Sequence, residues 1–184
     1  MENRLQSSFR RGVKNWWISV LIGIFATLLG IWCFFTPLST FLAMTILFTV
    51  GFFVGGIFEI IFAFSNMNSM RNWGWTLVIG IIDVIFGIIL MSNMLISAEV
   101  LSYLIVFWIL FQAIWGIGLS IDLKNEKESG WGWLLTLSIL GLIFAIASLF
   151  RPAMSALFAA YMLAFSFMAY GIFRIYLGMR LRSI

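Results

Sequence analysis

The chain has 184 residues, of which 63% are hydrophobic, 18% aromatic and only 10% charged, and its formal net charge is +4. A soluble domain is about half apolar and about a quarter charged, so this chain has too little polar material to cover a surface in contact with water. The composition excludes a soluble globular domain and predicts a single integral membrane domain over residues 1–184.

Six charge-poor runs predict six membrane spans. The first run without charges, residues 15–58, is about twice as long as one helix needs to cross ~30 Å of hydrocarbon, so it must fold back near Pro37. A transmembrane barrel would alternate polar and apolar residues, and these runs do not, so we expect an all-α membrane protein. In chain order the predicted spans are 16–36, 38–64, 73–91, 100–121, 131–150 and 153–176.

The basic residues predict that both termini are cytoplasmic, because lysine and arginine gather on the inner side of membrane proteins. With this orientation Arg71, Lys124, Lys127 and the basic residues before Trp16 lie inside, and Arg151 falls in an outer loop. The expected partner is the lipid bilayer, including its anionic headgroups. A homo-oligomer or a membrane-protein partner stays open. We expect no nucleic-acid binding, because the basic residues are scattered along the membrane flanks.

A pattern of one tryptophan and two small residues, spaced seven apart, occurs three times. The copies lie 57 and 58 residues apart, which predicts three repeated helical hairpins at about residues 12–68, 69–126 and 127–184. The three sets are Trp16, Gly23 and Gly30, then Trp73, Gly80 and Gly87, and then Trp131, Ser138 and Ala145.

The small residues of these sets predict where helices pack. Residues seven apart share one face of a helix, and small side chains on that face let two helix backbones approach closely in lipid. The even spans contain matching glycines at one repeat position, Gly56 and Gly171. The predicted helix-packing residues are therefore Gly23, Gly30, Gly80, Gly87, Gly56 and Gly171.

Asp83 is the most informative polar residue within a predicted span. It takes the repeat position of Ala26 and Gly141, so we expect it to lie on the small-residue face and point into the protein. Its place ten residues after Trp73 puts it ~15 Å deep, near the middle of the membrane. A carboxylate at that depth costs several kcal/mol unless it is paired or protonated.

The even spans supply partners for this carboxyl group. Gln112 and Tyr170 share one repeat position at about the depth of Asp83, and Glu59 and Arg174 share another position one turn nearer the cytoplasm. The sequence therefore predicts a buried polar cluster in which Glu59 pairs with Arg174. This cluster can form a proton or ion relay, or its groups can satisfy one another and fix the register of the helices.

Nothing in the sequence predicts an enzyme. The chain has no histidine, which removes the usual general base, the Ser-His-Asp triad and most metal sites. The glycines lie within the spans, and no phosphate-binding glycine-rich loop followed by lysine is present. Cys33 is the single cysteine and cannot form an intramolecular disulfide. We expect no catalytic residues, no cofactor and no metal.

The repeated hairpins resemble the HdeD family, which are small six-span bacterial membrane proteins of acid resistance. The resemblance covers residues 12–178 and rests on the tryptophan and glycine series with Pro37, and on the run Gly56-Ile57-x-Glu59-Ile60. The departures are Ser138 and Ala145 in place of glycine, and Ser92-Asn93 where a proline would end the third span.

The resemblance implies a multi-pass protein of the bacterial inner (plasma) membrane, linked to acid or envelope stress, without a known molecular mechanism. The alternative function is a small proton- or cation-coupled transporter or channel that uses buried Asp83 and Glu59. An assembly module that binds another membrane protein is a further alternative.

Overall fold

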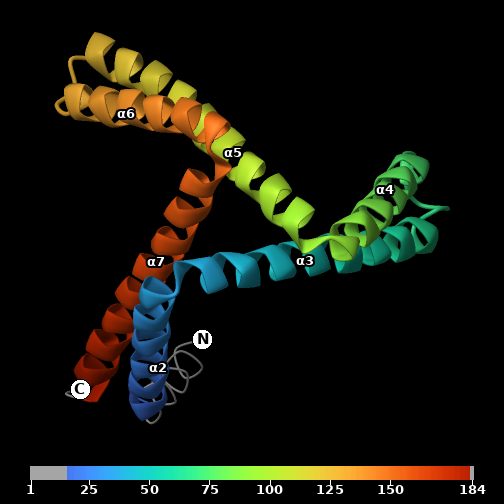
Figure 1. Ribbon diagram of the computed structural model, residues 1–184, viewed down its shortest axis with the longest axis horizontal. Coiled ribbons are helices and arrows are strands. Elements are labelled where there is room, and N and C mark those ends of the chain that lie inside the picture. Colours follow the sequence, from blue (N-terminus) through green and yellow to red (C-terminus); the bar gives the residue numbers. More distant parts are fainter. Residues whose placement is uncertain (1–15, 183–184) are drawn as a thin grey trace, which may run out of the picture. The chain divides into compact units, whose positions relative to one another are not determined.

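The computed structural model describes residues 16–182, which form six long helices (Figure 1). All six are long and apolar enough to cross a membrane, as the sequence predicts. The basic residues before Trp16, which support the predicted orientation, lie outside the described residues. The helices are α2 (Trp16–Phe35), α3 (Pro37–Ser65), α4 (Trp73–Ser92), α5 (Met94–Asn125), α6 (Trp131–Phe150) and α7 (Pro152–Arg182).

Short and long helices alternate along the chain. The first helix of each repeat, α2, α4 or α6, has 20 residues. The second helices, α3, α5 and α7, have 29, 32 and 31. A helix of about 30 residues is ~45 Å long, which exceeds the ~30 Å of hydrocarbon. The long helices must therefore tilt or extend into the headgroup region.

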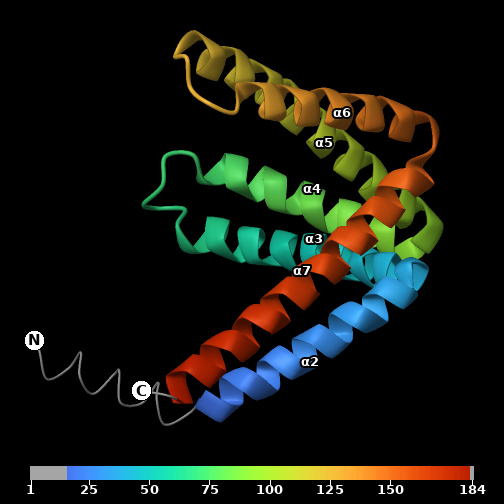
Figure 2. The same ribbon diagram turned by 90° about the vertical axis from the view of Figure 1, so that its left-hand side faces the viewer.

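The chain divides into two compact units, residues 1–40 with 157–184, and residues 41–156. In the second unit, α4 lies antiparallel to α3 and α6 lies antiparallel to α5 (Figure 2). In the first unit, α7 lies antiparallel to α2. The predicted repetition of a two-helix unit is confirmed. Close packing, however, joins the second helix of one repeat to the first helix of the next, and the last helix to the first.

A single residue joins the two helices of each repeat. These three joints, which we call elbows, are Thr36, Asn93 and Arg151. Pro37 and Pro152 begin the next helix at two of the elbows, where a proline costs no hydrogen bond because the first amides of a helix have no partner within it. At the remaining elbow, Asn93 is extended (φ −147°, ψ 106°), and its side chain accepts hydrogen bonds from the amides of Leu95 and Ile96, at 3.0 and 3.3 Å.

The Asn93 cap explains why α5 begins at Met94, six residues before the predicted start. The prediction began the span after the charged Glu99, but a charge near the membrane surface does not end a helix, whereas a side-chain cap fixes its first turn.

Each elbow is also followed by a buried hydroxyl at the same repeat position. Thr40 donates to the carbonyl of Thr36 at 2.9 Å, Ser97 to that of Asn93 at 3.1 Å, and Ser155 to that of Pro152 at 2.7 Å. The sequence analysis did not single out these residues, although their spacing of 57 and 58 is the period of the repeat.

Asn93→Ala should lower the free energy of unfolding by about 1 kcal/mol, because two amides of α5 lose their acceptor. Asn72 provides a matched control: it precedes α4 in the same way, but its side chain makes no capping hydrogen bond. Thermal unfolding of both variants in detergent checks this expectation. An equal effect of Asn93→Ala and Asn72→Ala would show that the Asn93 cap contributes nothing.

Candidate functional site

The α3·α4 pair contains both in-membrane carboxylates, and glycines determine how closely its two helices approach. A Cβ added to Gly56 would lie 2.7 Å from the amide nitrogen of Val84, and one added to Gly80 would lie 2.9 Å from that of Ile60. A Cβ on Gly87 would lie 2.8 Å from the Cα of Phe53. These contacts are with backbone, which cannot move aside, so only glycine fits at the three positions.

The α2·α7 pair has the same construction. A Cβ on Gly23 would lie 2.7 Å from the carbonyl oxygen of Gly171, and one on Gly30 would lie 2.8 Å from the amide of Met168. All six predicted packing glycines therefore lie where two helix backbones nearly touch. Gly178 lies at a similar contact, because a Cβ on it would lie 3.0 Å from the carbonyl oxygen of Trp16, and it was not among the predicted residues.

The α5·α6 pair differs because Ser138 and Ala145 replace two of the glycines. Ser138 is buried, and its hydroxyl donates to the carbonyl of Leu134 at 2.8 Å within its own helix. Gly116 of α5 lies opposite Ser138, so in this pair the glycine of the contact is on the second helix of the repeat, and serine is on α6. Gly116 was also missed by the sequence analysis, although it shares the repeat position of Glu59.

Asp83 lies on α4 against the face of α3 formed by Phe48, Gly51 and Phe52, in a shallow pocket of the α3·α4 pair. It is half-buried. That it points into the protein along the small-residue face stays a prediction. Its carboxyl group makes no hydrogen bond to another described residue. Phe52 packs edge-on against Phe48 and Phe86, with ring centroids 4.8 and 5.4 Å away, so the surroundings of Asp83 are aromatic.

Glu59 lies on α3 of the same helix pair, where its Cβ is 3.0 Å from the position of a Cβ on Gly80. The residue is half-buried. Its Oε2 atom is buried and has no hydrogen-bond partner within residues 16–182. A buried polar oxygen without a partner costs free energy, so this atom is an unsatisfied acceptor within the described helices.

Arg174 contacts Tyr170, one turn earlier on α7. Its Nε donates to the Tyr170 hydroxyl at 2.8 Å, and its guanidinium group lies 5.4 Å from the centre of the tyrosine ring. Glu59 belongs to the other unit, and its pairing with Arg174 stays a prediction, as does the polar cluster as a whole.

Gln112 and Tyr170 lie on the flanks of their own helix pairs, and their place in the polar cluster stays a prediction. Both are exposed, Tyr170 to 46%, because each lies one residue before the small residue that faces the partner helix, Ala113 in α5 and Gly171 in α7. One helical position is 100° of rotation, enough to move a side chain from the contact to its flank. Gln112 borders a shallow pocket with Ser138 and Gly141 on the α5·α6 pair.

No group of three or more histidine, cysteine, aspartate or glutamate residues that could hold a metal ion occurs within residues 16–182. Cys33 is half-buried and has a free thiol. The carboxyl groups within the described helices are Glu59 and Asp83 on the α3·α4 pair, and Glu99 and Asp122 near the two ends of α5.

Six long apolar helices in a three-fold repeat define a multi-pass α-helical membrane protein. The chain belongs to the family described as a short repeat of unknown function (DUF308), which matches residues 21–92, 78–150 and 136–184. The matches begin 57 and 58 residues apart, which is the period seen in the sequence. No curated protein and no solved structure matches the chain.

The extent of the family matches agrees with the packing of the helices. The first match, residues 21–92, is longer than one period and includes α3 together with α4, its partner from the next repeat. The second match, residues 78–150, includes α5 and α6 in the same way. These two matches therefore each contain a complete packed pair, whereas the third, residues 136–184, contains α7 without its partner α2.

Proposed function

We propose that this protein is a non-enzymatic component of the bacterial inner membrane that serves resistance to acid or envelope stress. The resemblance to the HdeD family carries the stress role. The observation that supports a response to protons is that Asp83 and Glu59 both lie on the α3·α4 pair within the membrane spans. Carboxylates in a membrane span are expensive and are usually functional.

The other helix pairs lack carboxyl groups at these repeat positions. Ala26 and Gly141 take the place of Asp83, and Arg174 and Gly116 take the place of Glu59. The repeat fold therefore forms without either carboxyl group, so neither is required by the architecture itself. A function that depends on protons has these two groups as its candidates.

The orientation with both termini in the cytoplasm is part of the same proposal. Arg71, Lys124 and Lys127 lie at the loop ends of the helix pairs, and Arg151 lies at an elbow, at the opposite end of α6. Lys124 lies 5.0 Å from the ring of Trp131, an arrangement suited to the interface between headgroups and hydrocarbon.

A second candidate function is a small proton- or cation-coupled transporter or channel. The buried Oε2 of Glu59, without a partner in the described part of the chain, favours it. This function predicts pH-dependent ion flux in proteoliposomes that contain the purified protein, and loss of that flux in Glu59→Gln. Proteoliposomes whose flux equals that of protein-free liposomes would exclude it.

Survival after an acid challenge tests the stress role. A strain that lacks the gene should die faster than its parent, and the wild-type protein should restore survival. Asp83→Asn, expressed at the same level in the membrane, should fail to restore it, because the amide keeps the shape of the side chain but binds no proton. Thr136→Val, an exposed change on α6, is the control and should restore survival fully.

The other outcomes are equally informative. Rescue by Asp83→Asn as complete as by wild type would remove the carboxyl group from the mechanism and leave the stress role intact. Failure of the wild-type protein to rescue an expressing strain would overturn the stress role itself.

A further inference from the structure

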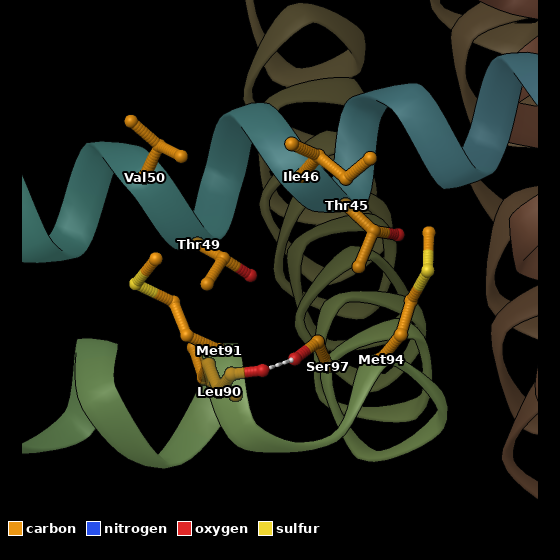
Figure 3. Close-up of a pocket in the computed structure, with 8 residues that line it drawn as sticks. All are labelled: Thr45, Ile46, Thr49, Val50, Leu90, Met91, Met94 and Ser97. Carbon is orange, nitrogen blue, oxygen red and sulfur yellow. Dashed lines mark hydrogen bonds between the residues drawn. The ribbon is translucent and has the colours of Figure 1, made fainter.

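A cavity of about 200 Å³ lies between α3 and the Asn93 elbow, wholly within the unit of residues 41–156. Thr45 and Thr49 of α3 face Leu90 of α4 and Ser97 of α5 across it (Figure 3). Its lining residues are Thr45, Ile46, Thr49, Val50, Leu90, Met91, Met94 and Ser97. None of them is charged, so a charged ligand would lose its hydration without gaining a counter-ion.

The hydroxyl groups of the cavity are not equivalent. Thr45 donates to the carbonyl of Phe41 at 2.9 Å, and Ser97 donates to backbone carbonyls of the elbow, those of Leu90 and Asn93. Thr49 is only 5% exposed, yet its hydroxyl makes no hydrogen bond to any residue in the described part of the chain. The Thr49 oxygen is not itself fully buried, because Thr49 lines the open cavity. Its O–H can therefore donate a hydrogen bond to a ligand with an acceptor oxygen.

The next repeat closes the same junction with a direct hydrogen bond. The residues equivalent to Thr45 and Ser97 are Ser102 and Ser155, and Ser155 donates directly to the carbonyl of Ser102 at 3.1 Å. The equivalent of Thr49 is Val106, which is fully buried and has no polar group. The fold therefore accepts an apolar side chain, Val106, at this repeat position. Beside the Asn93 elbow the same position is Thr49, whose hydroxyl lines the cavity.

We propose that this cavity binds a small neutral molecule with one acceptor oxygen, of the alcohol class. Its hydrocarbon part would lie against Ile46, Val50 and Leu90, and its oxygen would accept the hydrogen bond of Thr49. Cavities of about 150 Å³ lined by apolar side chains bind a benzene ring, so this volume admits a ligand of that size. Met91 and Met94, exposed to 58% and 42%, form the rim through which it would enter.

The methionines of the rim provide a direct measurement. The protein is labelled with ¹³C at its methionine methyl groups, reconstituted in nanodiscs, and titrated with 1-hexanol and, separately, with n-hexane. The Met91 and Met94 resonances, assigned by single Met→Leu changes, should shift and saturate with 1-hexanol. Met162 and Met179 are exposed on α7 and do not line the cavity, so they should report only partition into the bilayer.

Two variants test the role of Thr49. Thr49→Val keeps the shape of the side chain but removes one hydrogen bond. It should weaken the affinity for 1-hexanol about fivefold and leave the affinity for n-hexane unchanged. Thr49→Leu fills the cavity and should abolish saturation for both molecules. Thr136→Val removes an exposed hydroxyl on α6 and should bind as wild type does. Thermal unfolding of each variant establishes that it is folded.

Two results would overturn the proposal. Shifts of Met91 and Met94 that rise linearly, in parallel with those of Met162 and Met179, would show that the cavity is not a binding site. Saturable binding of n-hexane as tight as that of 1-hexanol, unaffected by Thr49→Val, would show an apolar void without the assigned hydrogen bond.

Discussion

Gly56→Leu should separate α3 from α4 and lower the free energy of unfolding by about 3 kcal/mol or more, the upper range for overpacking a tight contact. The Cβ of the new side chain would lie 2.7 Å from the amide nitrogen of Val84 and 2.8 Å from the carbonyl oxygen of Gly80. Both atoms belong to the backbone of α4, so the helices must move apart. The dispersion contacts along the whole pair then weaken, and in lipid no hydrophobic effect compensates for them.

The adjacent glycine is the matched control. A Cβ on Gly55 meets nothing within 4 Å, so Gly55→Leu adds a side chain on the flank of the pair. Leucine has a higher helix propensity than glycine by up to about 1 kcal/mol, so Gly55→Leu should be neutral or stabilising. Thermal unfolding in a mild detergent, followed by circular dichroism, compares the two. Equal melting temperatures for both variants would show that the contact at Gly56 is not tight.

The membrane spans and their repetition were predictable from the sequence because they depend on local patterns. A charge-poor run of about 20 residues is sufficient to identify a span, and the glycines repeat at intervals of seven within each odd span. Gly23, Gly30, Gly80 and Gly87 all lie at close helix contacts as a result. These patterns describe the surface of a single helix, and a single helix is what the sequence specifies most directly.

The partner of each helix was not predictable in the same way. Seven-residue spacing marks a face of α4 but does not say whether α3 or α5 will cover it. The hairpin drawn from the repeat pairs α4 with α5, which are neighbours across the Asn93 elbow, whereas the glycines of α4 contact Gly56 and Phe53 of α3. Which two helices pack together depends on the complementary shapes of their faces in the folded protein, and the spacing of residues within one helix does not contain this information.

The candidate site shows the same division. The place of Asp83 within α4 could be predicted, because it depends only on position along the sequence. Its depth in the membrane and its orientation into the protein stay predictions. The exposure of Tyr170 could not be predicted, because a rotation of one residue separates it from Gly171 at the contact. The cavity beside Thr49 could not be predicted from the sequence either, because it depends on the relative position of α3, α4 and α5.

Pairing between repeats raises the question of what covers the two helices at the ends of the series. Among the described helices α2 is the first and α7 the last, so pairing between consecutive repeats covers the small-residue face of neither. The structure pairs them with each other through Gly23, Gly30 and Gly171. Phe34 at the far end of α2 adds ring contacts to Tyr161 and Phe165 of α7, at 5.4 and 5.9 Å. The faces that contain Gly23, Gly30 and Gly171 thereby have a partner, as those of Gly56, Gly80 and Gly87 do.

Gly23→Leu should therefore loosen α7, although the two helices are separated by most of the chain. Its Cβ would lie 2.7 Å from the carbonyl oxygen of Gly171 and 2.8 Å from the amide of Ile175, and neither backbone atom can yield. We expect amide hydrogen exchange in α7 to become at least about tenfold faster, which corresponds to a loss of ~1.4 kcal/mol in local stability. Exchange in α5 and α6 should change little.

Gly118→Leu is the control for this experiment, because a Cβ on Gly118 meets nothing within 4 Å. It adds the same side chain to a membrane helix of the other unit and should leave the exchange of α7 unchanged. If Gly23→Leu accelerated exchange in α3, its neighbour within the repeat, and left α7 protected, the helices of each repeat would be packed against each other, and the pairing of first and last helix would be wrong. Acceleration confined to α2 and α7 would instead mean that the end helices of the series depend on each other for stability in the membrane.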